Sequence, residues 1–525
     1  MAKINLETTA VESREQRLGT IVYWDGNAQE LSEQSGYSKK SKCGKGCNLC
    51  EMKGPFTQPS VCSEQMVECQ AGNVREAVLI QHAPIGCSAS QSMYNTIYRI
   101  GLASRGHKVE NLRISSTNLT EGDMVFGGVE KLRLTIEDVW NHYHPQAIFV
   151  GTSCATGIIG DDVDSVTEEY TEKLGIPVIP LHCEGFRSKH WSTGFDQTQH
   201  GILRQIVRKP TKKQEDLVNV INLWGSDVFG PMLANLNLRV NYVVDMATVE
   251  ELAQMSEAAV TVAFCNTLGT YLAEGLEQAF GVPQARAPQP YGVLGTDAWL
   301  REIARITHRE HLVEDFIKSE HERIAPQVEE LKKKLKGLEG FISTGSAYAH
   351  GLIEVMRELG VTINGSVVFH HDPVYDSGDE SQDTLAHLVD NYGNVDNFVV
   401  SIRQPFQFFT ALRKNNPDFI LIRHNGLAPL AARLGIPAAP LGDEHIAIGY
   451  NGLINMGNLI LEIIERKRFC QDLSKHVTHQ YTDWWAAQTD PAILAKHPEL
   501  IWDDADTAEA IPSKRPEPVR DGAGQ

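Results

Sequence analysis

Three cysteines of this sequence, Cys87, Cys154 and Cys265, each come at or shortly after the end of a short apolar run. If those runs are parallel strands, the thiols lie at the carboxyl ends of the strands, where α/β sheets present their ligands. The segments after Cys154 and Cys265 have the pattern of helix starts, and a thiolate at a helix start has a lowered pKa, as metal ligation requires. The pattern favours a metal-cluster site, with buried structural thiols as the alternative.

Six apolar runs have the length and composition of strands that are buried on both faces. They are residues 77–80, 147–150, 218–223, 259–264, 398–400 and 419–422. Amphipathic helices that end at glycine lie between such runs, as in YTEKLGIPVIP at 170–180. Strands that alternate with helices predict an α/β fold with parallel sheets and right-handed crossovers.

Two charged segments divide the chain. RKPTKK at 208–213 precedes a new strand, and residues 308–338 carry Glu and Lys at helical spacing, which predicts a long solvated helix between domains. Boundaries near 212 and 337 give an N-terminal arm plus α/β unit at 1–212, further α/β units at 213–337 and 338–470, and a tail at 471–525.

The composition limits the classes of function. With 42% hydrophobic and 22% charged residues, the 525-residue chain has the balance of a globular protein, and its apolar runs are too short to span a membrane. The net charge of −19 disfavours binding to nucleic acid or anionic membranes. The first residues lack the apolar segment of a secretory signal, so we expect a cytoplasmic location and reduced thiols among the ten cysteines.

Several motifs occur together in a fixed order. They are HAPIGC at 82–87, CATGIIGDD at 154–162 and CEGFR at 183–187, with Cys62 standing 25 residues before Cys87. In this order and spacing the chain resembles the α-type subunits of the nitrogenase molybdenum-iron protein family, from about residue 60 to 465. The resemblance implies three Rossmann-like parallel-sheet domains.

The resemblance also implies two iron–sulfur sites. Cys62, Cys87 and Cys154 would be the α-side thiolates of a P-cluster-type 8Fe-7S cluster, shared with a β-type subunit in an α2β2 assembly. Cys69 remains an alternative to Cys62, because it lies nearby. Cys265 would bind the terminal iron of a nitrogenase-type iron–sulfur cofactor, whose metal content and organic ligand the sequence leaves open. No P-loop motif occurs here, so an ATP-hydrolysing iron protein would supply the electrons.

His445 is the candidate ligand for the opposite end of that cofactor. It is the only imidazole in the loop PLGDEHIAIGYNG at 440–452, and the pattern E-H-x-x-x-G-Y is similar to the family's assembly scaffolds. The alternative is a polar loop histidine capped by Asp443 or Glu444.

The departures from the family pattern bear on the substrate. Where dinitrogen-reducing members have Q-S-L-G-H, this chain reads WSTGF at 191–195, so Trp191 and Phe195 replace a glutamine and a proton-donating histidine. An arginine-bearing loop appears as TGSAYAH at 344–350, and the lysine associated with homocitrate appears as Gly426. These changes argue against dinitrogen as the substrate.

An apolar pocket suits a small uncharged substrate, and the chain is most similar to methylthio-alkane reductases, which release methanethiol and a hydrocarbon from volatile organic sulfur compounds. We expect Trp191, Phe195 and His350 at the reaction site. The candidate proton donors are His190, Tyr348, His350, His370 and His371.

A further group, Cys43, Cys47 and Cys50, lies outside the family motifs. Its C-x-x-x-C-x-x-C spacing is that of radical S-adenosylmethionine enzymes, but the segment before it is polar rather than a strand. An extra small cluster, a metal staple or unliganded thiols are the alternatives. Three functions thus remain: a catalytic subunit, a scaffold for cofactor assembly, and a radical enzyme.

Overall fold

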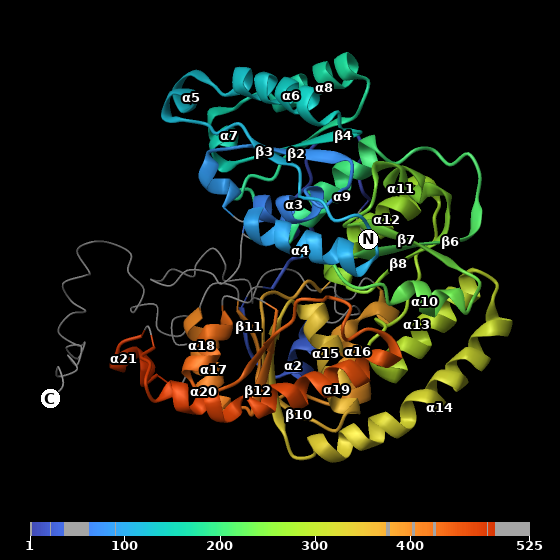
Figure 1. Ribbon diagram of the computed structural model, residues 1–525, viewed down its shortest axis with the longest axis vertical. Coiled ribbons are helices and arrows are strands. Elements are labelled where there is room, and N and C mark those ends of the chain that lie inside the picture. The colour runs from blue at the N-terminus through green and yellow to red at the C-terminus, as the bar shows by residue number, and fades with distance from the viewer. Residues whose placement is uncertain are drawn as a thin grey trace.

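The computed structural model describes residues 3–488 apart from 22, 36–61, 90, 189, 374–378, 402–404, 424–426 and 480. Cys43, Cys47, Cys50 and Gly426 lie outside the described residues. The fold is α/β with three separate sheets, as the sequence predicts (Figure 1). All six apolar runs that predict strands lie in strands, namely β2, β4, β6, β8, β11 and β12. Among the described residues, no helix is both long enough and apolar enough to pass through a bilayer.

The first sheet has the strand order β3-β2-β4-β5, and all of its pairs are parallel. Its strands are β2 (Ala77–His82), β3 (Ile114–Ser116), β4 (Ala147–Thr152) and β5 (Val178–Leu181). Its helices are α3 (Ser63–Ala71), α4 (Gln91–Ser104), α5 (Glu121–Phe126), α6 (Val129–Tyr143), α7 (Cys154–Ile159), α8 (Val163–Leu174) and α9 (Thr193–Gln205). Every residue of β2 and β4 is buried, which is why both strands begin with four consecutive apolar residues, at 77–80 and 147–150.

The second sheet is small and parallel, with the order β7-β6-β8. Its strands are β6 (Gln214–Asn222), β7 (Arg239–Val244) and β8 (Ala258–Ala263). Its helices are α10 (Phe229–Ala234), α11 (Val249–Ala253), α12 (Asn266–Phe280) and α13 (Gly292–Ile306). Cys265 stands between the end of β8 and the first residue of α12.

The third sheet has six strands in the order β1-β11-β10-β9-β12-β13. They are β1 (Tyr23–Gly26), β9 (Glu339–Thr344), β10 (Thr362–Val368), β11 (Phe398–Ser401), β12 (Phe419–Ile422) and β13 (Ala438–Pro440). Its helices include α15 (Ser346–Glu358), α16 (Thr384–Tyr392), α17 (Pro405–Asn415), α18 (Ala428–Arg433), α19 (Gly449–Glu465), α20 (Lys467–Ser474) and α21 (Asp483–Ala486).

The edge strand β1 comes from the N-terminal part of the chain. It pairs antiparallel with β11, and α2 (Ala28–Ser35) packs on α16, so residues 23–35 lie with the third sheet (Figure 1). Local sequence does not reveal this, because the pairing joins residues more than 350 positions apart in the chain. The domain boundaries near 212 and 337 remain predictions. Residues 23–35, which the predicted unit 1–212 includes, lie with the third sheet and not with the first.

The long charged helix that the sequence predicts is α14 (Glu310–Leu335), which runs along one side of the molecule (Figure 1). It is not solvated all round. A stripe that includes Val313, Ile317, Ile324 and Val328 is buried, and the helix packs on α13 and α19. The charged residues therefore mark its outer face only.

The N-terminal arm contacts all three units. Arg14, the first residue of α1 (Arg14–Leu18), is 1% exposed and forms ion pairs with Asp196 of α9 and Asp372 beyond β10, at 2.9 and 3.1 Å. Its guanidinium also donates to the carbonyl oxygen of Thr267 in α12. One buried side chain thus connects elements of the three sheets.

Helices α3 and α9 cross in close contact, and the crossing requires glycine. A Cβ at Gly194 would lie 2.1 Å from the carbonyl oxygen of Ser63, in the first turn of α3. Because that atom belongs to the backbone, a side chain at 194 would push α3 away from α9. Cys62 caps α3, so the crossing also determines where its thiol lies.

We expect Gly194→Ala to destabilise the protein by about 3 kcal/mol, since overpacking a rigid backbone contact costs up to about that amount. The matched control is Gly122→Ala in the exposed helix α5, where the nearest atom to an added Cβ is 3.8 Å away. That change should leave stability unchanged or raise it by up to about 1 kcal/mol. Chemical denaturation of both variants measures the difference, and equal midpoints would contradict the packing argument.

Candidate functional site

Cys62, Cys87 and Cys154 lie together at the carboxyl edge of the first sheet. Cys62 is the N-cap of α3, Cys87 lies in the 3₁₀ turn Ile85–Ser88 after β2, and Cys154 is the first residue of α7 after β4. Strands β2 and β4 are neighbours, so their following turns meet at one edge. Ser153 caps α7 by accepting the backbone N–H of Thr156, which fixes the turn that presents Cys154.

The backbone at Gly185, in the CEGFR segment, passes directly beside two of these thiols. A Cβ there would lie 3.4 Å from Cys154 Sγ and 3.8 Å from Cys62 Sγ. The close approach explains the glycine and shows that Cys62 and Cys154 flank the same residue. Cys69, by contrast, is 2% exposed on α3, and its electrostatic neighbours include Asp245 and Arg423 rather than Cys87. The geometry groups Cys62, and not Cys69, with the other two thiols.

Electrostatics disfavours bare thiolates at this site. Burial raises the pKa of Cys62, and burial followed by Glu64 and the other two thiols raises the pKa of Cys87 to about 12. Burial also raises the pKa of Glu64 to about 7. Bound metal supplies the positive charge that lets such thiols deprotonate. The donor set therefore fits a metal cluster better than it fits reactive thiolates.

Within the described ranges, no group of three His, Cys, Asp or Glu side chains is positioned to hold a single metal ion. This finding does not conflict with a cluster, because each thiolate of a multi-iron cluster binds a different iron and the thiols need not converge on one point. Two thiols beside Gly185 and a third on the turn after the neighbouring strand fit the wider spacing of a cluster.

The rim of this site is apolar and open. Cys154 is exposed, and Ile85, Ile158 and Phe186 on the same turns are 62%, 77% and 54% exposed. Large exposed apolar side chains beside a metal-type donor set are typical of a surface that a partner covers. The site is thus half-formed by this chain.

Cys265 marks a second site, in the interior. Its electrostatic neighbours include Tyr291 and Tyr348, whose rings are 6.0 Å apart. Both phenol groups are buried, and neither oxygen has a hydrogen-bond partner in the part of the chain that the structure describes. Buried hydroxyls without partners are uncommon in proteins and fit a polar or anionic group that would occupy the adjoining space.

His445 has the geometry of a metal-ligating histidine. Its Nδ1–H donates to the carbonyl oxygen of Ser226 at 2.7 Å, which leaves a lone pair on Nε2. Nε2 is buried and has no partner among the described residues. Burial, followed by the nearby charge of Arg105, lowers the pKa of His445 to about 4, so the ring is neutral. Asp443 does not cap the His445 ring, because its carboxylate accepts a hydrogen bond from the backbone N–H of His445 instead.

Three packing contacts orient the His445 ring. The rings of Phe229 and Phe264 each approach it edge-on at 5.1 Å. A Cβ added at Gly225 would lie only 2.5 Å from Cγ of the His445 ring. Phe264 precedes Cys265 in the sequence, so His445 and Cys265 both lie around the end of β8. This places the two candidate cofactor ligands beside the same strand.

Trp191 and Phe195 form an aromatic wall at the start of α9. Their rings meet edge-on at 5.8 Å, and both side chains are buried. His190 stacks on Trp191 at 5.3 Å, and His370 approaches the same indole edge-on at 5.7 Å. The sequence names His190 and His370 among five candidate proton donors, but it does not show that both rings lie against Trp191, because His370 comes from a different sheet.

His350 lies deeper in the third unit. On α15, its Nδ1 is 2.9 Å from the hydroxyl of Thr384, and its nearest rings include Phe398 and His371 rather than Trp191. His371 in turn contacts the hydroxyl of Ser35 at 2.8 Å. Their roles in chemistry remain predictions.

Two buried arginines were not predicted from the sequence. Arg423, at the end of β12, pairs with Glu444 and lies over the ring of Trp224. Arg105 donates to the carbonyl oxygen of Gly225 and lies over the ring of Tyr242. Both bring positive charge near His445, although the familiar arginine-bearing loop is lost. No spacing in the sequence could reveal them, because their partners come from other elements.

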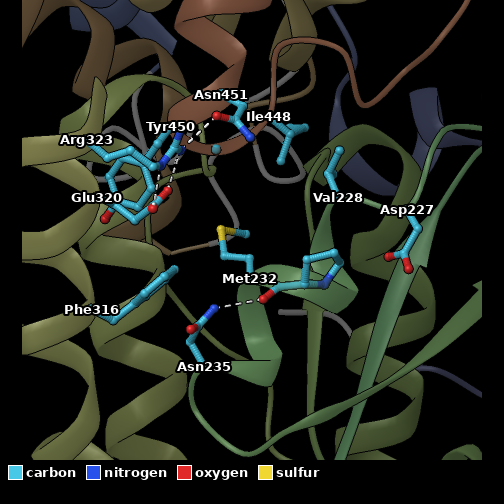
Figure 2. Close-up of a pocket in the computed structure, with 12 residues that line it drawn as sticks. Asp227, Val228, Met232, Asn235, Phe316, Glu320, Arg323, Ile448, Tyr450 and Asn451 are labelled. Atoms are coloured by element: carbon cyan, nitrogen blue, oxygen red, sulfur yellow. Dashed lines mark hydrogen bonds and ion pairs between the residues drawn. The ribbon is translucent and has the colours of Figure 1, made fainter. Parts of the chain in front are cut away.

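A surface pocket of about 320 Å³ lies between α10, α14 and the start of α19, as Figure 2 shows. Arg323 on its wall pairs with Glu320 and donates to Asn451. Asp227 and Ile448, which line it, are close in sequence to Ser226 and His445. The pocket therefore adjoins the His445 loop, but its lining includes none of the candidate ligands.

Comparison with known proteins identifies the family of this chain. A family model described as "Nitrogenase component 1 type Oxidoreductase" matches residues 66–465. A nitrogenase iron-molybdenum cofactor biosynthesis protein NifE of Methanococcus maripaludis is 27% identical over 74% of this chain and 79% of its own length. A nitrogenase molybdenum-iron protein alpha chain of the same species is 26% identical over 82% of this chain and 93% of its own length.

Among solved structures, nitrogenase Cp1 at pH 5 matches with a TM-score of 0.64 and 22% identity, over 82% of this chain and 91% of that chain. This likeness confirms the predicted fold.

Replacing Cys154 by Ala should remove iron from the purified protein, because one of the three grouped thiols is lost. The control is Cys470→Ala in α20, a buried thiol outside the group, which should keep the full iron content. Anaerobic iron analysis with EPR spectroscopy distinguishes the two. Equal iron in both variants would show that Cys154 is not a ligand.

Proposed function

The chain belongs to the nitrogenase component 1 type oxidoreductase family, and from that premise we propose that it is the catalytic α-type subunit of a reductase that cleaves C–S bonds of small methylthio-alkanes. The observation that carries the proposal is the wall of Trp191 and Phe195, buried and aromatic, at the position where dinitrogen-reducing members have glutamine and histidine. An apolar wall selects a small uncharged substrate and excludes water.

In this proposal the chain holds two groups. Cys62, Cys87 and Cys154 hold a P-cluster-type cluster, shared with a β-type subunit that covers the apolar rim of Ile85 and its neighbours. Cys265 and His445 hold an active-site iron–sulfur cofactor between them. The neutral His445 ring with its available Nε2 supports this role, as do the unpaired hydroxyls of the tyrosines beside Cys265.

The reaction consumes two electrons and two protons: R–S–CH₃ gives R–H and CH₃–SH. The C–S bond breaks, the carbon gains one hydrogen and the sulfur the other. The cofactor supplies low-potential electrons and a soft metal that tolerates thiolate. An iron protein that hydrolyses ATP delivers these electrons to the chain. The protein's own residues bind the alkyl chain against Trp191 and Phe195 and deliver the protons.

A cofactor-assembly scaffold is the second candidate. The 27% identity to a NifE protein and the Glu444–His445 pair favour it. A scaffold must release its cofactor, whereas here the residues of the aromatic wall, His190, Trp191, Phe195 and His370, are all buried. A dinitrogen-reducing subunit is the third candidate, and Phe195 argues against it because a phenyl ring cannot donate a proton.

Anaerobic turnover tests the proposal. The chain, copurified with its β-type partner and supplied with the iron protein, ATP and ethyl methyl sulfide, should release methanethiol and ethane in equal amounts. Ammonia from dinitrogen without thiol release would restore nitrogenase. Transfer of a cofactor to another protein, with no turnover of any substrate, would assign the scaffold function.

Shortening Trp191 should change the substrate range. Trp191→Ala opens the wall, so kcat/KM for ethyl methyl sulfide should fall about tenfold or more, while a bulkier thioether should lose less or gain, because each unfilled methylene costs about 1–3 kcal/mol of discrimination. Trp191→Phe, which keeps a ring, serves as the control. If Trp191→Ala changed both substrates equally, Trp191 would not line the substrate site.

A further inference from the structure

The proposed reaction consumes protons in a wall where the usual histidine is replaced by Phe195. The candidate imidazoles differ in the partners of their Nδ1 or Nε2 atoms. His190 contacts the hydroxyl of Ser192, His350 that of Thr384, and His371 that of Ser35. His370 instead contacts a carboxylate, that of Asp372. A carboxylate partner favours the protonated, proton-donating form of an imidazole.

We propose that His370, oriented by Asp372, is the group that donates protons to the bound substrate, an inference that rests on the proposed function. His370 follows strand β10 of the third sheet, whereas Phe195 belongs to α9 of the first. The imidazole that Phe195 replaces in α9 is thus supplied by His370, which follows strand β10.

Two rings set the position of His370. It is fully buried, its ring is 4.3 Å from that of His190, and it approaches Trp191 edge-on at 5.7 Å. Trp191 in turn contacts Phe195. A substrate seated against Trp191 would therefore lie beside His370. The sequence could not single out this residue, because His370 meets Trp191 only in the folded chain.

The two nitrogens of His370 have different surroundings. Nδ1 lies 3.1 Å from a carboxylate oxygen of Asp372, which is an ion-pair contact without the geometry of a hydrogen bond. Nε2 is buried and has no hydrogen-bond partner among the described residues. With Nδ1 directed to the carboxylate, Nε2 is the atom from which a proton can leave toward substrate. The arrangement is that of a histidine–aspartate pair, in which the carboxylate fixes the ring and stabilises the imidazolium.

The charges around the pair favour a cationic ring. Burial raises the pKa of Asp372, but His370, Arg14 and His190 lower it by more, so the carboxylate stays charged. Arg14 pairs with Asp372 and also with Asp196, which accepts two hydrogen bonds from the same guanidinium. Thr20 also donates to Asp372 and holds it in place.

Kinetics of the holoenzyme, with its β-type partner, iron protein and ethyl methyl sulfide, tests this role. His370→Gln should lower kcat for methanethiol release about 100-fold, the usual contribution of a general acid, with unchanged iron content and resting EPR spectrum. His387→Gln removes an imidazole that also pairs with a carboxylate, that of Glu354, but is not part of the aromatic wall, and should keep wild-type kcat. Wild-type kcat in His370→Gln with intact clusters would overturn the inference.

The pH profile separates proton donation from a merely structural role. Because donation requires a protonated donor, wild-type kcat should fall as pH rises. Asp372→Asn removes the stabilising charge, so this fall should move to lower pH, and His370→Gln should lack it. An unshifted profile in Asp372→Asn overturns the inference, and this variant decides the matter if His370→Gln loses its clusters.

Failure of the two proposals is distinguishable. If the wild-type holoenzyme releases no thiol from any thioether, the proposed function fails and this inference with it. If the wild type releases thiol and the His370 and Asp372 variants behave like the wild type, only this inference fails.

Discussion

The buried ion network of Arg14 is the interaction on which the arrangement of the interior depends. One guanidinium joins the N-terminal arm to Asp196 on α9, to Asp372 beyond β10 and to a carbonyl in the first turn of α12. These three elements carry Phe195, His370 and Cys265 respectively, or lie within two residues of them. Breaking such a pair leaves an uncompensated buried charge and costs about 3–5 kcal/mol. The network therefore keeps the candidate reaction site in register across three sheets.

The N-terminal arm that carries Arg14 makes further contacts with the first and third sheets. The arm that carries Arg14 continues to Ile21, which bridges to His371, and to strand β1 on the edge of the third sheet. His200 of α9 contacts the carbonyl oxygen of Thr8 in the same arm. An arm with contacts on all three units is a structural part of the interior of the protein. Its sequence has no cysteine before residue 43.

The two metal-type sites differ in how they meet solvent, and the difference follows from their elements. The three thiols on the first sheet lie on turns at an outer edge, with exposed apolar neighbours, which is the surface that the proposed β-type subunit would cover. Cys265 and His445 lie around the end of β8, between sheets, where tyrosine hydroxyls and a neutral imidazole have no partner within the described chain. Electrons would enter at the open site and be used at the closed one.

The sequence by itself determined the local chemistry of this protein. It predicted the six apolar strands, the parallel α/β architecture and the thiols at strand ends, because each of these depends on neighbours within one segment. The replacement of an imidazole by Phe195 is what the resemblance to the family implies. The sequence could not predict that β1 and α2 join the third sheet, that α14 buries one face, or that Arg105 and Arg423 lie near His445. Nor could it choose among the histidines. Only the tertiary structure brought His370 to Asp372 and Trp191, because contacts between residues far apart in the chain are set by how the sheets pack and not by local propensity.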